Sequence, residues 1–97
     1  MNIPLPTSSR FTIYTKQNCK YCEKVKDELE HSFETPEIIP CDDFLTNDFL
    51  TKTNNNKEMF VAFMNSLTKD KFKTFPVVFF DKTYIGGYNE TVLYLQK

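Results

Sequence analysis

The sequence has no long apolar run and no surplus of positive charge, and each absence excludes a class of protein. A membrane-spanning helix needs about 20 consecutive apolar residues, and no segment of the 97-residue chain approaches that length. Twelve basic and thirteen acidic side chains give a formal net charge of −1, which argues against a nucleic-acid or membrane-surface partner because both need concentrated positive charge. The first ten residues contain two prolines and no apolar stretch, so we expect no secretory signal and a cytoplasmic protein.

Cysteine is also scarce, with three residues in the chain, two of which form the closely spaced pair Cys19 and Cys22. Small secreted domains usually depend on several disulfides, which this odd count does not favour. A structural zinc ion takes four ligands, and only Cys41 and His31 are available to join the pair. Because they do not form a second closely spaced pair, we expect no bound metal.

The length and the composition predict a single domain over residues 1–97. Residues 1–9 are expected to be a loose lead-in, because Pro4 and Pro6 disfavour regular strand pairing. An apolar fraction of 40% is typical of a globular chain.

Short β-branched and aromatic runs alternate with segments that have a helical apolar period. Phe60, Phe63, Met64 and Leu67 follow a helical repeat that we assign to the core. Asp81-Lys82 is expected to be a hairpin turn, and Asn89 is expected to cap the last helix. Strands are predicted at 10–15, 37–41, 77–80 and 83–85. The first helix is predicted from about residue 19 to the Thr35-Pro36 pair, and a short second helix around Phe44, Leu45, Phe49 and Leu50. A third helix is predicted after the break at 54–56, and a last one at 90–96.

This order predicts an α/β fold with a small mixed four-stranded sheet flanked by helices. The first half forms a βαβ unit with a right-handed crossover. The second half adds an antiparallel hairpin and a helix, which gives a ββα unit.

Cys19-Lys20-Tyr21-Cys22 lies at the predicted junction between the first strand and the first helix. A cysteine at a helix N-terminus points its sulfur at free N–H groups, and these favour the thiolate. Lys16 and Lys20 add positive charge nearby. We therefore interpret Cys19 as the attacking thiol in thiol–disulfide exchange and Cys22 as the resolving thiol. Two buried, inert cysteines are the alternative.

Two further motifs precede and follow the last strands. Thr74-Phe75-Pro76 introduces a strand with a proline, and a cis Phe75–Pro76 bond is one way to accommodate it, although a trans bond is more usual. Gly86-Gly87-Tyr88-Asn89-Glu90 is a tight turn into a helix N-terminus. Such a turn permits close approach of a ligand and suits a carboxylate.

Together, these three motifs resemble those of a glutaredoxin, a glutathione-dependent oxidoreductase of the thioredoxin fold, and the resemblance covers roughly residues 10–96. It implies an enzyme in which Cys19 attacks protein disulfides and glutathione mixed disulfides, and Cys22 resolves protein-linked intermediates. It also implies roles in electron transport and cell redox homeostasis. Glutathione would be the electron donor. The substrates would be proteins with disulfides, with ribonucleotide reductase as one candidate, and the protein would be a monomer.

The resemblance also assigns a glutathione site. It implies that Pro76 is cis and that the adjacent backbone pairs with the cysteinyl part of glutathione. The γ-glutamyl carboxylate would lie at the last helix, the glycyl carboxylate would meet two lysines, and a tyrosine ring would flank the tripeptide. The residues so assigned are Lys16, Tyr21, Lys73, Thr74, Phe75, Pro76, Gly87, Asn89 and Glu90.

The chain departs from the family pattern at several points. Lys20 stands where proline is usual, and Asn89 stands where aspartate is frequent. Cys41 matches no motif of the family, so we expect it to have a structural role. The segment between Asp42 and Thr74 is longer than in compact members, and the last helix is short. These differences leave open the redox potential and the partner surface.

Three other functions fit the same residues. A redoxin of the same fold takes electrons from a flavoprotein reductase instead of glutathione. A glutaredoxin can also carry a [2Fe–2S] cluster between two protomers, although the bulk of Lys20 disfavours that dimer. An adaptor with inert thiols is the fourth possibility.

Overall fold

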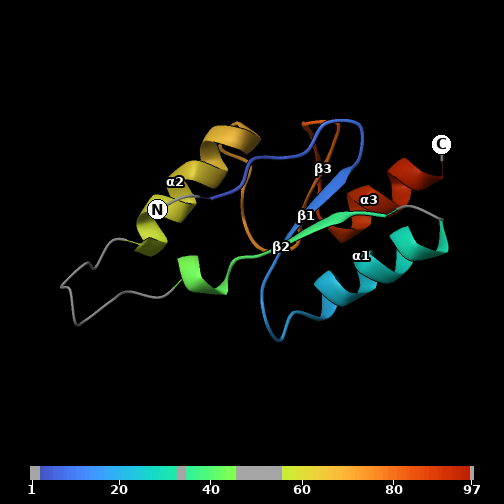
Figure 1. Cartoon of the computed structure of the whole chain (residues 1–97), viewed down its shortest axis with the longest axis horizontal. Helices are drawn as coiled ribbons and strands as arrows, with labels where there is room; N and C mark the ends of the chain where they lie inside the picture. Colours follow the sequence, from blue (N-terminus) through green and yellow to red (C-terminus); the bar gives the residue numbers. More distant parts are fainter. Residues whose placement is uncertain (1–2, 33–34, 46–55, 97) are drawn as a thin grey trace.

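A computed structural model describes residues 3–32, 35–45 and 56–96 of the protein (Figure 1). No helix in these ranges is long and apolar enough to cross a membrane. The elements are, in chain order, β1 (Phe11–Thr15), α1 (Lys20–His31), β2 (Glu37–Pro40), the 3-10 turn η1 (Asp42–Phe44), α2 (Asn56–Thr68), β3 (Val77–Phe80), β4 (Thr83–Gly86) and α3 (Tyr88–Leu95).

The four strands form one mixed sheet in the order β2-β1-β3-β4. Strand β1 runs parallel to β2 and antiparallel to β3, and β4 pairs antiparallel with β3. Helices α1 and α3 lie together on one side of the sheet and α2 lies on the other (Figure 1). The predicted βαβ and ββα units are therefore confirmed.

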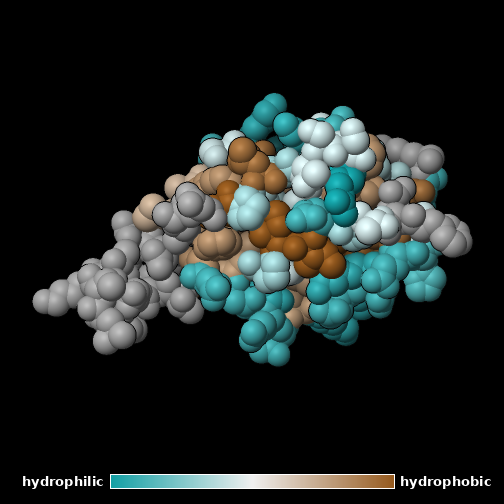
Figure 2. Space-filling model, in the orientation of Figure 1, coloured by the Kyte–Doolittle hydropathy of each residue, from teal (hydrophilic) through white to brown (hydrophobic). Residues whose placement is uncertain are grey.

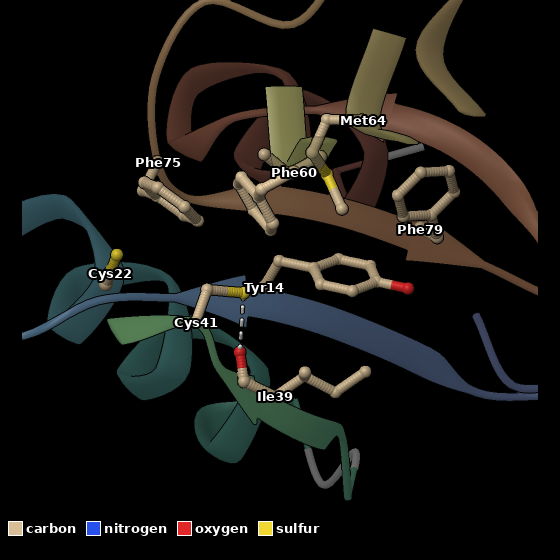
Figure 3. Close-up of a cluster of buried hydrophobic side chains, with 9 residues drawn as sticks. Tyr14, Cys22, Ile39, Cys41, Phe60, Met64, Phe75 and Phe79 are labelled. Carbon is tan, nitrogen blue, oxygen red and sulfur yellow. Dashed lines mark hydrogen bonds between the residues drawn. The ribbon is translucent and has the colours of Figure 1, made fainter. Parts of the chain in front are cut away.

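The two faces of the sheet bury separate hydrophobic clusters because side chains alternate along β1 and β3. Ile13 and Val78, which pair across the two strands, face the helix α1 residues Val25 and Leu29. The opposite face packs against α2, where the predicted helical stripe is confirmed. The central members of this second cluster are Tyr14, Ile39, Cys41, Phe60, Met64, Phe75, Val77 and Phe79 (Figure 3).

Two polar groups inside the second cluster have backbone partners. The Tyr14 hydroxyl donates to the Pro4 carbonyl at 2.6 Å. The Cys41 thiol donates to the Ile39 carbonyl at 3.4 Å (Figure 3). Burial raises the pKa of Cys41 to about 12, so this thiol stays protonated at neutral pH. These features support a structural role for Cys41.

The N-terminal segment, expected to be a loose lead-in, forms no helix or strand over residues 3–9 but is anchored to the sheet. Pro6 is buried. The Thr7 N–H donates to Thr12 Oγ1, and the Ser9 N–H donates to Asp81 Oδ1, each at 2.8 Å.

Figure 2 shows apolar side chains over the middle of this view and hydrophilic ones along α1.

The last helix begins earlier than predicted, and Asn89 is not its N-cap. Gly87 is the N-cap, and α3 starts at Tyr88. The Thr91 N–H donates to the Gly87 carbonyl at 3.1 Å, and the Glu90 carboxylate accepts the Gly87 N–H at 2.7 Å. A carboxylate that reaches back from the third helical position stabilises a start at Gly87, which leaves Asn89 in the first turn.

Two other predictions concern the turns. The hairpin turn at Asp81 and Lys82 is confirmed, since both residues have positive φ values of 49° and 69° as a two-residue hairpin requires. The short helix predicted around Phe44 is represented by η1 alone. Its remaining residues Phe49 and Leu50, and most of the predicted break at 54–56, lie outside the described residues.

Candidate active site

The dithiol motif lies where β1 leads into α1. Cys19 has extended backbone angles and is the N-cap of α1, and its sulfur accepts the Cys22 N–H at 3.2 Å. The positive end of the helix dipole and the free N–H groups of the first turn therefore act on this sulfur. The structure has Cys19 and Cys22 joined in a disulfide. Lys16, just before the motif, and Lys20, within it, are both exposed.

The two sulfur-bearing residues differ in accessibility. Cys22 is fully buried, whereas Cys19 is only partly buried. Cys22 belongs to the cluster beneath α2, and Cys19 packs against the outside of that cluster. An incoming reactant can therefore reach Cys19 more easily than Cys22.

The loop before β3 brings Phe75 and Pro76 close to the dithiol. The Phe75–Pro76 peptide bond is cis. The Phe75 ring is buried, stacks on Phe60 with ring centroids 5.7 Å apart, and shares the cluster with Cys22 (Figure 3). Thr74 is exposed, so the loop presents a polar surface just before the buried strand.

The glycine turn presents the N-terminus of α3. Gly86 has a φ of +139°, and a Cβ there would lie 2.6 Å from Glu90 Cβ and Cγ, so only glycine fits. Gly87 carries no side chain that could accept from the first turn of α3, and the Glu90 carboxylate occupies only the Gly87 N–H. The N–H groups of the first turn are therefore available to a carboxylate from a ligand.

These three segments line one open groove of about 730 Å³. Among the predicted site residues, all but Lys16 and the two cysteines line it. The groove lies beside the dithiol, since Tyr21 is in the motif itself. The complete lining is Tyr21, Asp70, Lys71, Lys73, Thr74, Phe75, Pro76, Tyr84, Ile85, Gly86, Gly87, Tyr88, Asn89 and Glu90.

Some of these lining residues escape sequence reasoning. The sequence does contain a pattern that points to Lys71. In Lys71-Phe72-Lys73 two lysines, both exposed, flank a phenylalanine that packs against Phe60. Tyr84 has no such signal, since it reaches the groove from β4, where its ring packs against Phe79 with ring centroids 5.5 Å apart. Burial and, second, the charge of Glu90 raise the pKa of Tyr84, so its hydroxyl is neutral at physiological pH.

A family model described as glutaredoxin matches residues 11–85, which is most of the chain. The chain belongs to the glutaredoxin family. As a glutaredoxin-family protein with a CxxC pair, it is a thiol oxidoreductase. No curated protein sequence matches the chain.

Solved glutaredoxin structures share the fold. Glutaredoxin 1 from Francisella tularensis, complexed with cacodylate, has a TM-score of 0.68 and 22% identity, covering 90% of this chain and 92% of that one. A buckwheat glutaredoxin–glutathione complex has a TM-score of 0.66 and 20% identity, covering 89% of this chain and 67% of that one. These matches confirm the predicted thioredoxin fold.

A third similar structure is the glutaredoxin-like NrdH-redoxin from Escherichia coli, described as having a thioredoxin-like activity profile. Its TM-score is 0.55 and its identity 20%, covering 88% of this chain and 91% of that one. The glutaredoxin fold therefore occurs in proteins with more than one activity profile.

Within the described ranges, no group of three or more His, Cys, Asp and Glu side chains is placed to hold a metal ion.

Proposed function

We propose that the protein is a glutathione-dependent thiol–disulfide oxidoreductase that uses Cys19 as nucleophile and Cys22 as resolving thiol. One observation carries the proposal: a single groove runs from the dithiol motif to the N-terminus of α3, with lysines along its lining. Such a groove offers separate sites for the thiol and for the carboxylates of a small anionic peptide.

The first step follows from the position of Cys19. Once the disulfide is reduced, the helix N-terminus stabilises the Cys19 thiolate. This thiolate attacks the glutathione sulfur of a mixed disulfide, the substrate thiolate leaves and takes a proton, and a Cys19–glutathione disulfide forms. A second glutathione thiolate then attacks this disulfide, which releases oxidised glutathione and regenerates the Cys19 thiolate.

The lining of the groove supports recognition of glutathione at several points. The free N–H groups of α3, with Gly87 as N-cap, suit the γ-glutamyl carboxylate. Lys73 and Lys71 are exposed on the lining and suit the glycyl carboxylate. Tyr21 supplies an aromatic ring beside the reacting sulfur. Lys16 lies outside the lining, and we keep it only as a longer-range source of positive charge.

Protein disulfides require the second cysteine. After Cys19 attacks a protein disulfide, the Cys22 thiol lies one helical turn away and attacks the new mixed disulfide, which releases the reduced protein and forms the Cys19–Cys22 disulfide. We propose disulfide proteins as partners, with ribonucleotide reductase as one candidate. Because this cycle needs a pool of reduced glutathione, we expect it in the cytoplasm.

A redoxin reduced directly by a flavoprotein reductase is the second candidate. The similarity to NrdH-redoxin, which is described as having a thioredoxin-like activity profile, supports this second candidate. The two candidates share Cys19 and Cys22 and differ only in the donor that reduces the disulfide.

The test supplies each donor in turn. The protein would reduce the insulin disulfides with NADPH, glutathione reductase and glutathione, and separately with NADPH and thioredoxin reductase. We expect turnover with the glutathione system and little with the reductase alone. Turnover with the reductase alone would reject glutathione dependence in favour of the redoxin. Cys41→Ala serves as the control variant, because the Cys41 thiol is fully buried and takes no part in the proposed exchange, so its loss should leave turnover unchanged.

A further inference from the structure

Lys24 does not line the groove, yet it contacts two residues that do. Its Nζ lies 5.2 Å from the ring centroid of Tyr21 and 5.7 Å from that of Tyr88. The two ring centroids are 5.7 Å apart. Tyr21 and Lys24 are three residues apart on α1, so their side chains share one helix face. The cluster of Lys24, Tyr21 and Tyr88 therefore joins α1 to the start of α3.

The contacts of Lys24 differ from those of a neighbouring lysine on the same helix. Lys26 pairs with Glu23 at 3.1 Å. Among the described residues, Lys24 has no carboxylate within ion-pair distance, and its ammonium lies within the range of attraction to both aromatic rings. A solvated surface lysine would instead extend away from the rings.

The position of the Tyr21 side chain matters for ligand binding because Tyr21 lines the groove and is 52% exposed. An exposed side chain that is free to change rotamer must be ordered when a ligand packs on it, and that ordering weakens binding. A Lys24 ammonium attracted to both rings would hold the Tyr21 ring against Tyr88 before any ligand arrives. The part of the groove wall that Tyr21 forms would then be in place in advance.

We propose that Lys24 is a positioning residue that fixes Tyr21 against Tyr88 and so raises the efficiency with which glutathione mixed disulfides react at Cys19. The inference rests on the proposed function, because it concerns recognition in the same groove. It involves no covalent step. Lys24 acts through the two rings and does not touch the reacting sulfur.

The test compares three variants with wild type. Lys24→Met removes the charge and keeps an unbranched side chain, Lys24→Arg keeps the attraction to the rings, and Lys26→Met is the matched control on the same helix. We expect kcat/KM for a small glutathione mixed disulfide to fall about threefold in Lys24→Met, chiefly through KM. Lys24→Arg should restore it, and Lys26→Met should match wild type.

A second readout separates positioning from a direct effect of charge on the thiolate. Alkylation of Cys19 by iodoacetamide needs no groove contact, so its pH profile should be the same in Lys24→Met and wild type. The effect of Lys24→Met on kcat/KM should also disappear when Tyr88 is already replaced by leucine. A shifted alkylation profile that accounts for the loss, or a loss that persists without Tyr88, would overturn the proposal, as would an unchanged kcat/KM.

A third readout does not depend on glutathione. Ring-proton NOEs between Tyr21 and Tyr88 should be present in wild type and Lys24→Arg and weakened in Lys24→Met. If the wild type fails to turn over glutathione mixed disulfides, the proposed function is rejected while the NOEs still test the positioning. NOEs of equal strength in wild type and Lys24→Met would overturn the positioning alone.

Discussion

Replacing Gly86 with alanine is expected to destabilise the protein and to distort the groove at the start of α3. Gly86 has a φ of +139°, a conformation that side chains with a Cβ rarely adopt and that costs about 1–3 kcal/mol. The new Cβ would also lie 2.6 Å from Glu90 Cβ and Cγ and 2.7 Å from Oε1. Because Glu90 Cβ itself is in the way, a rotamer change of Glu90 cannot relieve the contact, and the start of α3 must shift.

That shift also weakens the hydrogen bond from the Gly87 N–H to the Glu90 carboxylate, which is 2.7 Å long. A hydrogen bond to a charged group contributes about 1.5–3 kcal/mol. Allowing for partial relaxation, we expect the free energy of unfolding to fall by at least about 2 kcal/mol. For a domain of this size the melting temperature should fall by about 8–16 °C.

Gly87→Ala is the matched control, one residue along the same turn. Gly87 has a φ of −99°, and a Cβ there would meet its nearest atoms at 3.5 Å, an ordinary contact. Thermal and urea unfolding followed by far-UV circular dichroism would compare the two variants with wild type. Equal stabilities for Gly86→Ala and Gly87→Ala would refute the reasoning.

Cys22→Ser should keep turnover of small glutathione mixed disulfides but lose most reduction of insulin disulfides, because only the second reaction needs a resolving thiol; equal loss of both activities would contradict this division of roles. Lys73→Glu should raise the KM for glutathione mixed disulfides about threefold to tenfold by repelling a carboxylate, whereas Lys82→Glu, in the distant hairpin turn, should not; similar KM values would remove Lys73 from the site. In the oxidised protein, stability should fall as pH rises from about 9 toward 12, because Cys41 ionises near its usual pKa of 9.0 only after unfolding and its folded pKa is raised to about 12. Urea unfolding of Cys41→Ala across this range should give a shallower fall, and parallel curves would argue against the buried thiol as a source of the pH dependence.

Most of the fold was predictable because its periodic patterns are strong. The run Val77–Phe80 is short, β-branched and aromatic, and it forms the buried strand β3. The helical repeat that begins at Phe60 predicted the buried face of α2, and Phe60 and Met64 are fully buried. In both cases the local preference and the tertiary packing agree.

The start of α3 was not predictable from local preference alone. Asn89 and Gly87 are both acceptable N-caps. The choice depends on the Glu90 side chain, which reaches back to the Gly87 N–H. The anchoring of the N-terminal segment was not predictable either. Pro4 accepts a hydrogen bond from Tyr14, and Ser9 donates one to Asp81. Only the folded sheet brings these residues together.

The candidate site was predictable where a motif marks it and not where packing alone creates it. Tyr21, Pro76 and Gly87 lie in recognisable motifs, and the structure brings them to one groove. Asp70 and Tyr84 carry no such signal and reach the groove only through the tertiary fold.

The roles of glutathione and of Cys19 are tested most directly by the turnover of a small glutathione mixed disulfide, coupled through glutathione reductase to NADPH, in wild type and Cys19→Ser. We expect turnover by the wild type and none above background in the variant, because the nucleophile is lost. No wild-type turnover would contradict glutathione dependence. Wild-type turnover that persists in Cys19→Ser would contradict the assignment of Cys19 as the nucleophile.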